Sequence, residues 1–259
     1  MILNRSLRSY AASRSSCLAA LVVLGGLLLS ACSRESEMNA GAEAATQVGE
    51  ETAAPTEAEQ RALLLSPDDP VWAEAAPDSF RIRFETTQGA FVVSVVRGWA
   101  PLGADRIYNL VRYGYYDDAR FHRTVPDFIV QWGLAGDPDV TAAWLDRTLA
   151  DDPVVETNTR GSVAFAFTES ETRSTQIFIS LVDLSRLDEG GFAPFGRVTT
   201  GMDVVDALYS GYGEESGGGM RAGAQDSVIA GGNAYLDRAF PELDQLIRAT
   251  IEPGPDARE

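Results

Sequence analysis

The pattern of apolar and polar positions divides the chain into three parts. Residues 17–29 form an almost unbroken apolar run, residues 33–69 are polar with almost no aromatic side chains, and a regular alternation begins at Phe80. A period of two is typical of a strand that buries one face. The chain from Phe80 onward is therefore predicted to fold as a mainly β domain.

Within this domain the alternation predicts eight short strands. Phe80, Ile82 and Phe84 share one face of the first strand, and the turn at Gln88–Gly89 leads into the second. Strands are predicted over 80–86, 90–96, 121–124, 128–131, 161–167, 175–181, 195–198 and 246–252. Helical spacing predicts two main helices, in 99–114 and 201–213, and a short one over 234–240. This content favours a closed antiparallel eight-stranded β-barrel capped by two α-helices.

The start of the chain carries the pattern of an export signal. Three arginines precede the apolar run, which is roughly 13 residues long and so short of the ~20 needed to cross a bilayer. The sequence LSAC that ends at Cys32 resembles a bacterial lipobox, which implies cleavage before Cys32 and lipidation of its thiol. A plain secretory signal is the alternative. Ser33 after the cysteine favours the outer over the inner membrane.

These features predict four segments. Residues 1–31 are a lipoprotein signal peptide, 32–78 a lipidated cysteine with a flexible acidic tether, 79–253 the folded domain and 254–259 a C-terminal tail. We expect a lipid-anchored protein of the bacterial cell envelope that faces the periplasm and is a monomer.

Charge and composition exclude several classes of site. The formal net charge of −17 disfavours nucleic acid as a partner. The two cysteines, Cys17 and Cys32, precede the domain, and His122 is the only histidine, so no Cys/His zinc cluster can form. No metal or cofactor is expected.

One strand pair carries unusual polar residues. Alternation places Arg123 on one face of its strand and Gln131 with Ile129 on one face of the returning strand, and it places Gln176 beside Phe178 on a third. The predicted result is a shallow apolar pocket with a few convergent donors. A purely structural arginine, stacked on a ring or paired with a carboxylate, is the alternative. The same alternation directs His122 away from Arg123.

The segment 114–133, GYYDDARFHRTVPDFIVQWG, closely resembles the cyclophilin signature. Residues 80–114 are similar to the family's first hairpin and first helix. Residues 161–180 resemble its strand-loop-strand region, and residues 187–208 resemble its L-D-G, F-G-x-V and G-M-x-V-V segment. These motifs occur in the family's order from Phe80 to Ile251, so the chain is identified as similar to the cyclophilin-type peptidyl-prolyl isomerases.

The resemblance implies roles for individual residues. It implies that Arg123 is the catalytic arginine and that Gln131 orients it, and that the substrate is bound by Phe128, Ile129, Ala166, Phe167, Gln176, Phe178, Leu187 and Phe192. The chain departs from the family's usual residues at four positions. Asp127 replaces a glycine, Phe167 replaces an asparagine, and Arg186 replaces a tryptophan. Phe192 falls near the position of the family's pocket histidine. Trp144 and Leu145, in an insertion at 136–155, are expected to shape one wall of the groove.

The implied function is cis/trans isomerisation of X-Pro bonds in proteins that fold in the envelope. The barrier arises from amide resonance, and the guanidinium of Arg123 can donate to the prolyl nitrogen of the twisted amide. The partners implied are proline-containing polypeptides. A non-catalytic module of the same fold that binds proline peptides or acts as a scaffold is the alternative.

Overall fold

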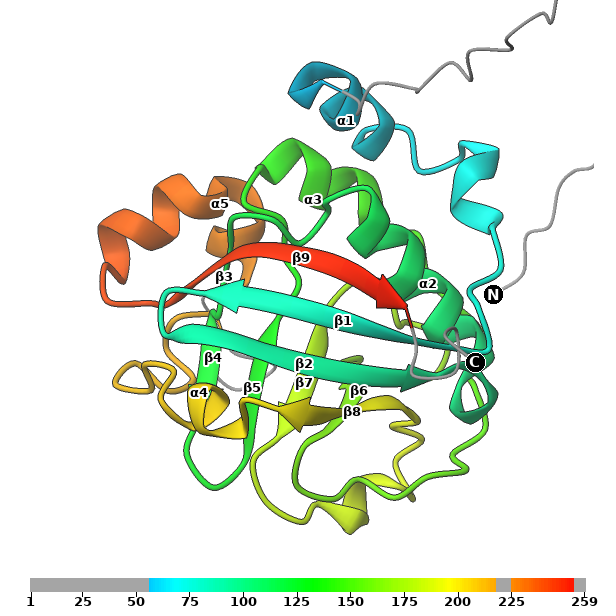
Figure 1. Ribbon diagram of the computed structural model, residues 1–259. Coiled ribbons are helices and arrows are strands. Elements are labelled where there is room, and N and C mark those ends of the chain that lie inside the picture. Colours follow the sequence, from blue (N-terminus) through cyan, green and yellow to red (C-terminus); the bar gives the residue numbers. More distant parts are fainter. Residues whose placement is uncertain (1–55, 218–224, 254–259) are drawn as a thin grey trace, which may run out of the picture. The chain divides into compact units, whose positions relative to one another are not determined.

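The computed structural model describes residues 56–217 and 225–253, all within the compact unit Thr52–Glu259. Nine antiparallel strands form one sheet in the order β3-β9-β1-β2-β8-β6-β7-β5-β4. The strands are β1 (Ser79–Thr86), β2 (Gly89–Val96), β3 (Ala119–Arg120), β4 (Arg123–Val125), β5 (Ile129–Trp132), β6 (Ser162–Phe165), β7 (Ile177–Ser180), β8 (Pro194–Thr200) and β9 (Gln245–Pro253). Figure 1 shows the sheet curling so that β1, β2 and β9 lie in front of β4 to β7.

The predicted mainly β antiparallel fold is confirmed, with two differences in detail. There are nine strands, since β3 precedes the predicted strand 121–124 and was not predicted, while β4 begins at Arg123, after Phe121 and His122. The sheet is a half-barrel whose edge strands are β3 and β4, and no ladder joins those two strands in the described part of the chain. The chain itself crosses the seam, because only Phe121 and His122 separate the two edges.

The core lies inside the curl and follows the predicted alternation. Every second residue of β1 is buried, and its partner strand β2 shows the same pattern. Trp132 from β5 meets the rings of Phe84, Phe91 and Phe121 at centroid distances of 5.5, 6.3 and 5.3 Å. Each such aromatic pair stabilises the core by about 0.5–1.5 kcal/mol beyond the effect of the area that the rings bury.

The described helices are more numerous than the two main ones predicted. They are α1 (Glu57–Leu64), α2 (Pro101–Arg112), α3 (Pro138–Trp144), α4 (Met202–Asp206) and α5 (Gln225–Ala239), with 3₁₀ turns η1 (Pro70–Ala73), η2 (Arg97–Trp99) and η3 (Ser185–Leu187). Helix α2 agrees with the prediction. Helix α4 is shorter than predicted, and the backbone N–H of Tyr209 donates to the Asp244 carboxylate at 2.6 Å instead of continuing a helix.

Part of the predicted tether is folded. Thr56 and Glu59 form a capping box that starts α1, and Leu64 at its end is buried. Trp144 of α3 donates from its indole nitrogen to the Leu64 carbonyl at 2.8 Å and meets the Trp72 ring at 4.8 Å. The expectation that Trp144 and Leu145 form a groove wall is therefore wrong, because Trp144 faces the core and α1 while Leu145 is exposed at the surface.

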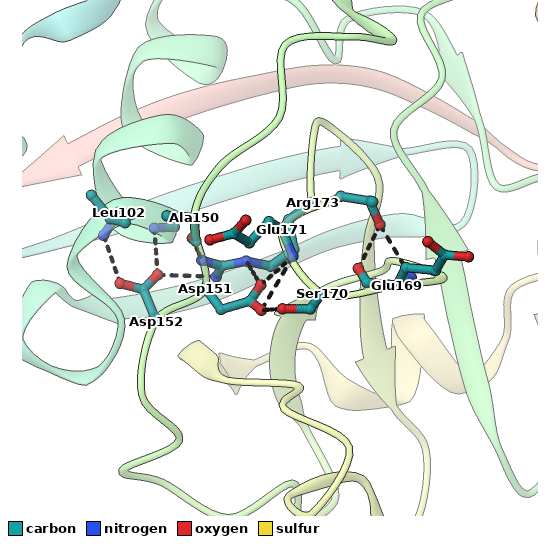
Figure 2. Close-up of polar contacts among 10 residues, drawn as sticks. Leu102, Ala150, Asp151, Asp152, Glu169, Ser170, Glu171 and Arg173 are labelled. Carbon is teal, nitrogen blue, oxygen red and sulfur yellow. Dashed lines mark hydrogen bonds and ion pairs between the residues drawn. The ribbon is translucent and has the colours of Figure 1, made fainter. Parts of the chain in front are cut away.

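A buried carboxylate begins helix α2. Ala100 supplies no side-chain cap, and the Asp152 carboxylate instead accepts from the backbone N–H groups of Leu102 and Gly103 at 3.0 and 2.9 Å. Arg173 donates to Asp152 at 3.0 Å, and both side chains are almost fully buried. Figure 2 shows Asp152 lying between Leu102 and Arg173. The 149–173 region is thereby tied to the helix that covers the sheet.

The described helices include none with both the length and the apolar character that a bilayer crossing requires. The predicted signal peptide 1–31, Cys32 and the tail 254–259 lie outside the described residues.

Candidate active site

A pocket of about 390 Å³ lies on the outer face of β4, β5 and β7 and the loops beside them. All ten residues predicted to contact or act on substrate line it, namely Arg123, Phe128, Ile129, Gln131, Ala166, Phe167, Gln176, Phe178, Leu187 and Phe192. Four further residues complete the lining: Thr168, Arg186, Glu214 and Gln225. The residues that the strand pattern and the family resemblance singled out therefore lie around one pocket, and the structure adds part of its rim.

Strand pairing holds Arg123 beside Gln131. The two residues are direct partners in the β4–β5 ladder, and the Arg123 Nη1 donates to Gln131 Oε1 at 2.9 Å. The guanidinium carbon lies 5.5 Å from the centre of the Phe128 ring. Arg123 is thus fixed at the edge of the pocket, with its side chain 14% exposed.

A chain of amide side chains continues from Arg123 across the pocket. Gln131 Nε2 donates to Gln176 Oε1 at 2.9 Å, and Gln225 Nε2 donates to the same oxygen at 3.0 Å. Gln131 is 4% exposed, so these bonds satisfy an amide that has little access to water. The network fixes the polar side of the pocket before a ligand arrives.

The other side of the pocket is apolar. Ile129, Ala164, Phe178 and Leu184 form a small buried cluster, distinct from the main core, against which Phe128, Ala166, Val182, Leu187 and Phe192 pack. The Phe178 and Phe192 rings meet nearly at right angles with centroids 5.8 Å apart. A small saturated five-membered ring, whose surface is mostly aliphatic carbon, suits such a surface.

His122 does not line the pocket. It is fully buried, and neither ring nitrogen has a hydrogen-bond partner among residues 56–217 and 225–253. Burial lowers the pKa of His122 to about 4, so the imidazole is neutral at pH 7. The alternation that directs His122 away from Arg123 agrees with its place outside the pocket lining.

Glu214 and Gln225 were not predicted. Both come from the region after α4, where Glu214 stands in the segment GYGEESGGG, whose glycines and acids show no period. A local pattern carries no information about a contact with Arg123, which is distant in sequence. For Glu214 the only signal in the sequence was a negative charge beside a glycine-rich stretch, and such a combination is equally typical of a solvated loop.

The arrangement of fold and pocket agrees with the comparisons to known proteins. The family model described as "Cyclophilin type peptidyl-prolyl cis-trans isomerase/CLD" matches residues 81–229. The chain belongs to this cyclophilin family. A curated peptidyl-prolyl cis-trans isomerase A from Dickeya dadantii is 31% identical over 149 residues, covering 52% of this chain and 74% of the relative. The peptidyl-prolyl cis-trans isomerase-like 1 of Gibberella zeae is 28% identical over 171 residues, which cover 64% of this chain and 98% of the relative.

Solved cyclophilins share the fold. A Cryptosporidium parvum cyclophilin aligns with a TM-score of 0.50 at 20% identity, covering 68% of this chain and 99% of that one. The same protein has been solved in the presence of the dipeptide Ala-Pro, again with a TM-score of 0.50, at 19% identity and covering 67% and 99%.

Two departures from the cyclophilin motif have structural explanations. Asp127, in place of the family's glycine, adopts φ 57°, a left-handed conformation that Asp tolerates better than most residues. Phe167 and Phe192, in place of asparagine and near the histidine position, stack on each other with centroids 4.2 Å apart. The second departure is a coupled pair, since each ring supplies the surface on which the other packs.

Proposed function

We propose that this cyclophilin isomerises X-Pro bonds of polypeptides in the bacterial cell envelope, with Arg123 as its catalytic residue. The observation that carries the proposal is a guanidinium held at the edge of an apolar pocket by Gln131 and the Phe128 ring. A pocket that only bound apolar side chains would have no use for a fixed planar cation.

The mechanism follows from the change that rotation makes in the amide. As the bond twists, resonance is lost and the prolyl nitrogen becomes a hydrogen-bond acceptor. Arg123 can donate to that nitrogen only in the twisted state, which lowers the barrier rather than stabilising either planar form. Phe178 and Ile129 hold the ring of the proline, while Gln176 and Gln131 keep the polar side ordered. No proton is transferred, so the neutral His122 is not needed.

The proposal predicts that Arg123→Ala lowers kcat/KM by about 100-fold, the scale of one lost transition-state donor. Exchange between cis and trans signals of a short Ala-Pro peptide, followed by NMR, measures the rate without a coupling enzyme. Arg123→Lys should recover little of it, because an ammonium lacks the planar fork.

The matched control is Arg147→Ala, which removes an arginine whose ion pair with Asp68 lies at the surface outside the pocket. It should leave the exchange rate unchanged. An Arg123→Ala variant as fast as the parent protein would contradict the catalytic role.

A non-catalytic peptide-binding module is the second candidate. Arg123 is already paired with the Glu214 carboxylate at 2.6 Å, and Phe167, Arg186 and Phe192 differ from the usual lining. Peptide binding with no acceleration of exchange in the parent protein would favour this candidate.

The envelope location is supported by the sequence pattern of residues 1–33. Cys32→Ser should abolish incorporation of labelled palmitate and move the protein from the membrane to the soluble fraction in a bacterial host. Separation of inner and outer membranes by density then tests the sorting expected from Ser33. Recovery of the parent protein in the soluble fraction without label would contradict the anchor.

A further inference from the structure

Glu214 contacts the residue on which the proposed mechanism depends, yet it belongs to none of the cyclophilin motifs in the sequence. Its Oε1 accepts from Arg123 Nη2 at 2.6 Å, and the Glu214 side chain is 33% exposed at the pocket rim. A carboxylate that accepts from a guanidinium makes one of the stronger hydrogen bonds in proteins.

The guanidinium is held from both of its terminal nitrogens. Gln131 accepts from Nη1 and Glu214 from Nη2, while the Phe128 ring lies 5.5 Å from the guanidinium carbon. With the Gln131 bond alone, the group could still swing about that single contact. Two anchors at opposite corners fix its orientation, and the second hydrogen on each Nη stays available to a substrate.

Glu214 is itself anchored next to Arg123. Two residues further on, the Ser216 hydroxyl donates to the backbone carbonyl of His122 at 2.7 Å, and Ser216 is buried. Gly217 has φ +127° and lies so close to Val228 that an added Cβ would approach its Cγ2 to 2.9 Å. The segment carrying Glu214 is therefore attached to the residue that immediately precedes Arg123, so that the two side chains share one support.

From this geometry we propose that Glu214 is a positioning residue that orients the Arg123 guanidinium for isomerisation. The inference rests on the catalytic role proposed for Arg123. The negative charge of Glu214 has an opposing effect, because it partly compensates the charge of Arg123 and so makes its N–H groups weaker donors. Orientation outweighs it because Glu214 is partly exposed to water, which screens its charge, whereas a small misplacement of a catalytic group is costly.

Three substitutions at Glu214 separate position from charge. E214Q keeps the length of the side chain and an oxygen that accepts from Nη2, whereas E214D keeps the charge but shortens the reach by one methylene. E214A removes both. The neighbouring E215A is the matched control, because Glu215 is exposed and makes no ion pair in the part of the chain that the structure describes.

We expect E214A and E214D to lower kcat/KM for an Ala-Pro peptide by about tenfold, through kcat rather than KM, as for an interaction made only in the transition state. E214Q should stay within about threefold of the parent protein, and E215A should be unchanged. The Arg123 Nε–H signal in protein labelled with ¹⁵N-arginine, assigned through R123K, should shift in E214A and E214D but not in E215A.

Two results would overturn the inference. Faster or unchanged turnover in E214A would make Glu214 a competitor of the substrate or a bystander. Full activity in E214D with a loss in E214Q would show that charge, not position, matters. An R123A variant as active as the parent protein would disprove the proposed catalytic role of Arg123. An inactive R123A variant together with fully active E214A and E214D variants would disprove only the role of Glu214.

Discussion

Phe167 and Phe192 show how two departures from a family motif compensate for each other. The rings stack at 4.2 Å with an interplanar angle of 24°, and both lie in the pocket lining. An asparagine and a histidine at these positions would offer polar groups to a peptide backbone. The stacked pair instead extends the apolar wall, which should favour bulky apolar side chains near the proline.

The stack predicts a measurable coupling between the two residues. In a double-mutant cycle of Phe167→Ala and Phe192→Ala, the unfolding free energies should be non-additive by about 1 kcal/mol, the scale of an aromatic pair. Urea unfolding of the four proteins gives the value. Phe167→Ala combined with Ile247→Ala, on the exposed surface of β9, should be additive within about 0.5 kcal/mol.

His122 predicts a pH dependence of stability. Above about pH 6.5 the imidazole is neutral in both the folded and unfolded states and contributes no pH dependence. Between 6.5 and about 4 only the unfolded state binds the proton, so stability falls as pH falls, and below about 4 the loss levels off. The loss amounts to about 3 kcal/mol.

His122→Phe tests that dependence, because a buried phenylalanine takes up no proton. The fall in unfolding free energy between pH 7 and pH 4.5 should be smaller in this variant than in the parent protein, whatever the carboxylates contribute to both. An identical fall in the two proteins would show that His122 does not titrate in this range.

At the residue scale, the strand period and the family motif together supplied the ten predicted lining residues. Arg123 and Gln131 face the same pocket because they are direct partners across the β4–β5 ladder, as alternation and the short turn between the strands favour. Glu214 and Gln225 could not be found in this way, since each reaches the pocket from an element whose place depends on tertiary packing.

At the scale of elements, Asp152 links a loop to a helix. It supplies the N-terminal cap that Ala100 cannot, and it neutralises the buried Arg173 (Figure 2). A carboxylate at a helix N-terminus is favoured by the exposed N–H groups and by the helix dipole. This one side chain therefore has two structural roles.

Asp152→Asn should lower the unfolding free energy by about 3 kcal/mol or more, because it removes the buried counter-ion of Arg173 and leaves only the more distant, partly exposed Asp151. The neighbouring Asp151→Asn is the control: its carboxylate is 32% exposed and lies 3.5 Å from Arg173, so about 1 kcal/mol or less should be lost. Equal effects of the two substitutions in denaturant unfolding would refute the assignment.

The elements predicted best are those in which buried side chains recur with the period of the strand or helix. The hairpin of β1 and β2, helix α2 and strand β9 lie where the pattern placed them. Helices α1 and α3 were missed because their stability comes from contacts between distant segments, such as the Trp144 bond to Leu64, rather than from a long apolar stripe of their own. Helix α5 begins well before the short helix predicted over 234–240, and Gly232 with φ 51° interrupts it.

At the scale of the whole molecule, α1 and η1 stabilise the domain without contributing to the pocket. Leu64 is buried, Trp72 packs on the core, and Gln60 donates to the Tyr113 carbonyl at 2.9 Å. None of the residues from Thr56 to Asp78 lines the candidate active site. Stability and catalysis are therefore separable in this part of the chain.

A protein that begins at Ala75 should keep the kcat/KM of one that begins at Thr56 but lose about 3 kcal/mol of unfolding free energy, since about one to two large apolar side chains lose their burial sites. Thermal unfolding and NMR exchange, measured on both proteins, test the two halves of the prediction. A loss of turnover at temperatures where the shorter protein is folded would contradict the separation.

The open seam between β3 and β4 has a consequence for the order in which this protein folds during its synthesis. Strand β3 pairs with β9, the last of the described strands, with Ala119 opposite Leu246, and Arg123 begins the strand on the far side of that seam. A nascent chain that still lacks β9 has no partner for β3 and leaves one side of β1 without its ladder. Turnover should thus appear only after β9 has left the ribosome and paired with β1 and β3, which makes activity a reporter of closure of this part of the sheet.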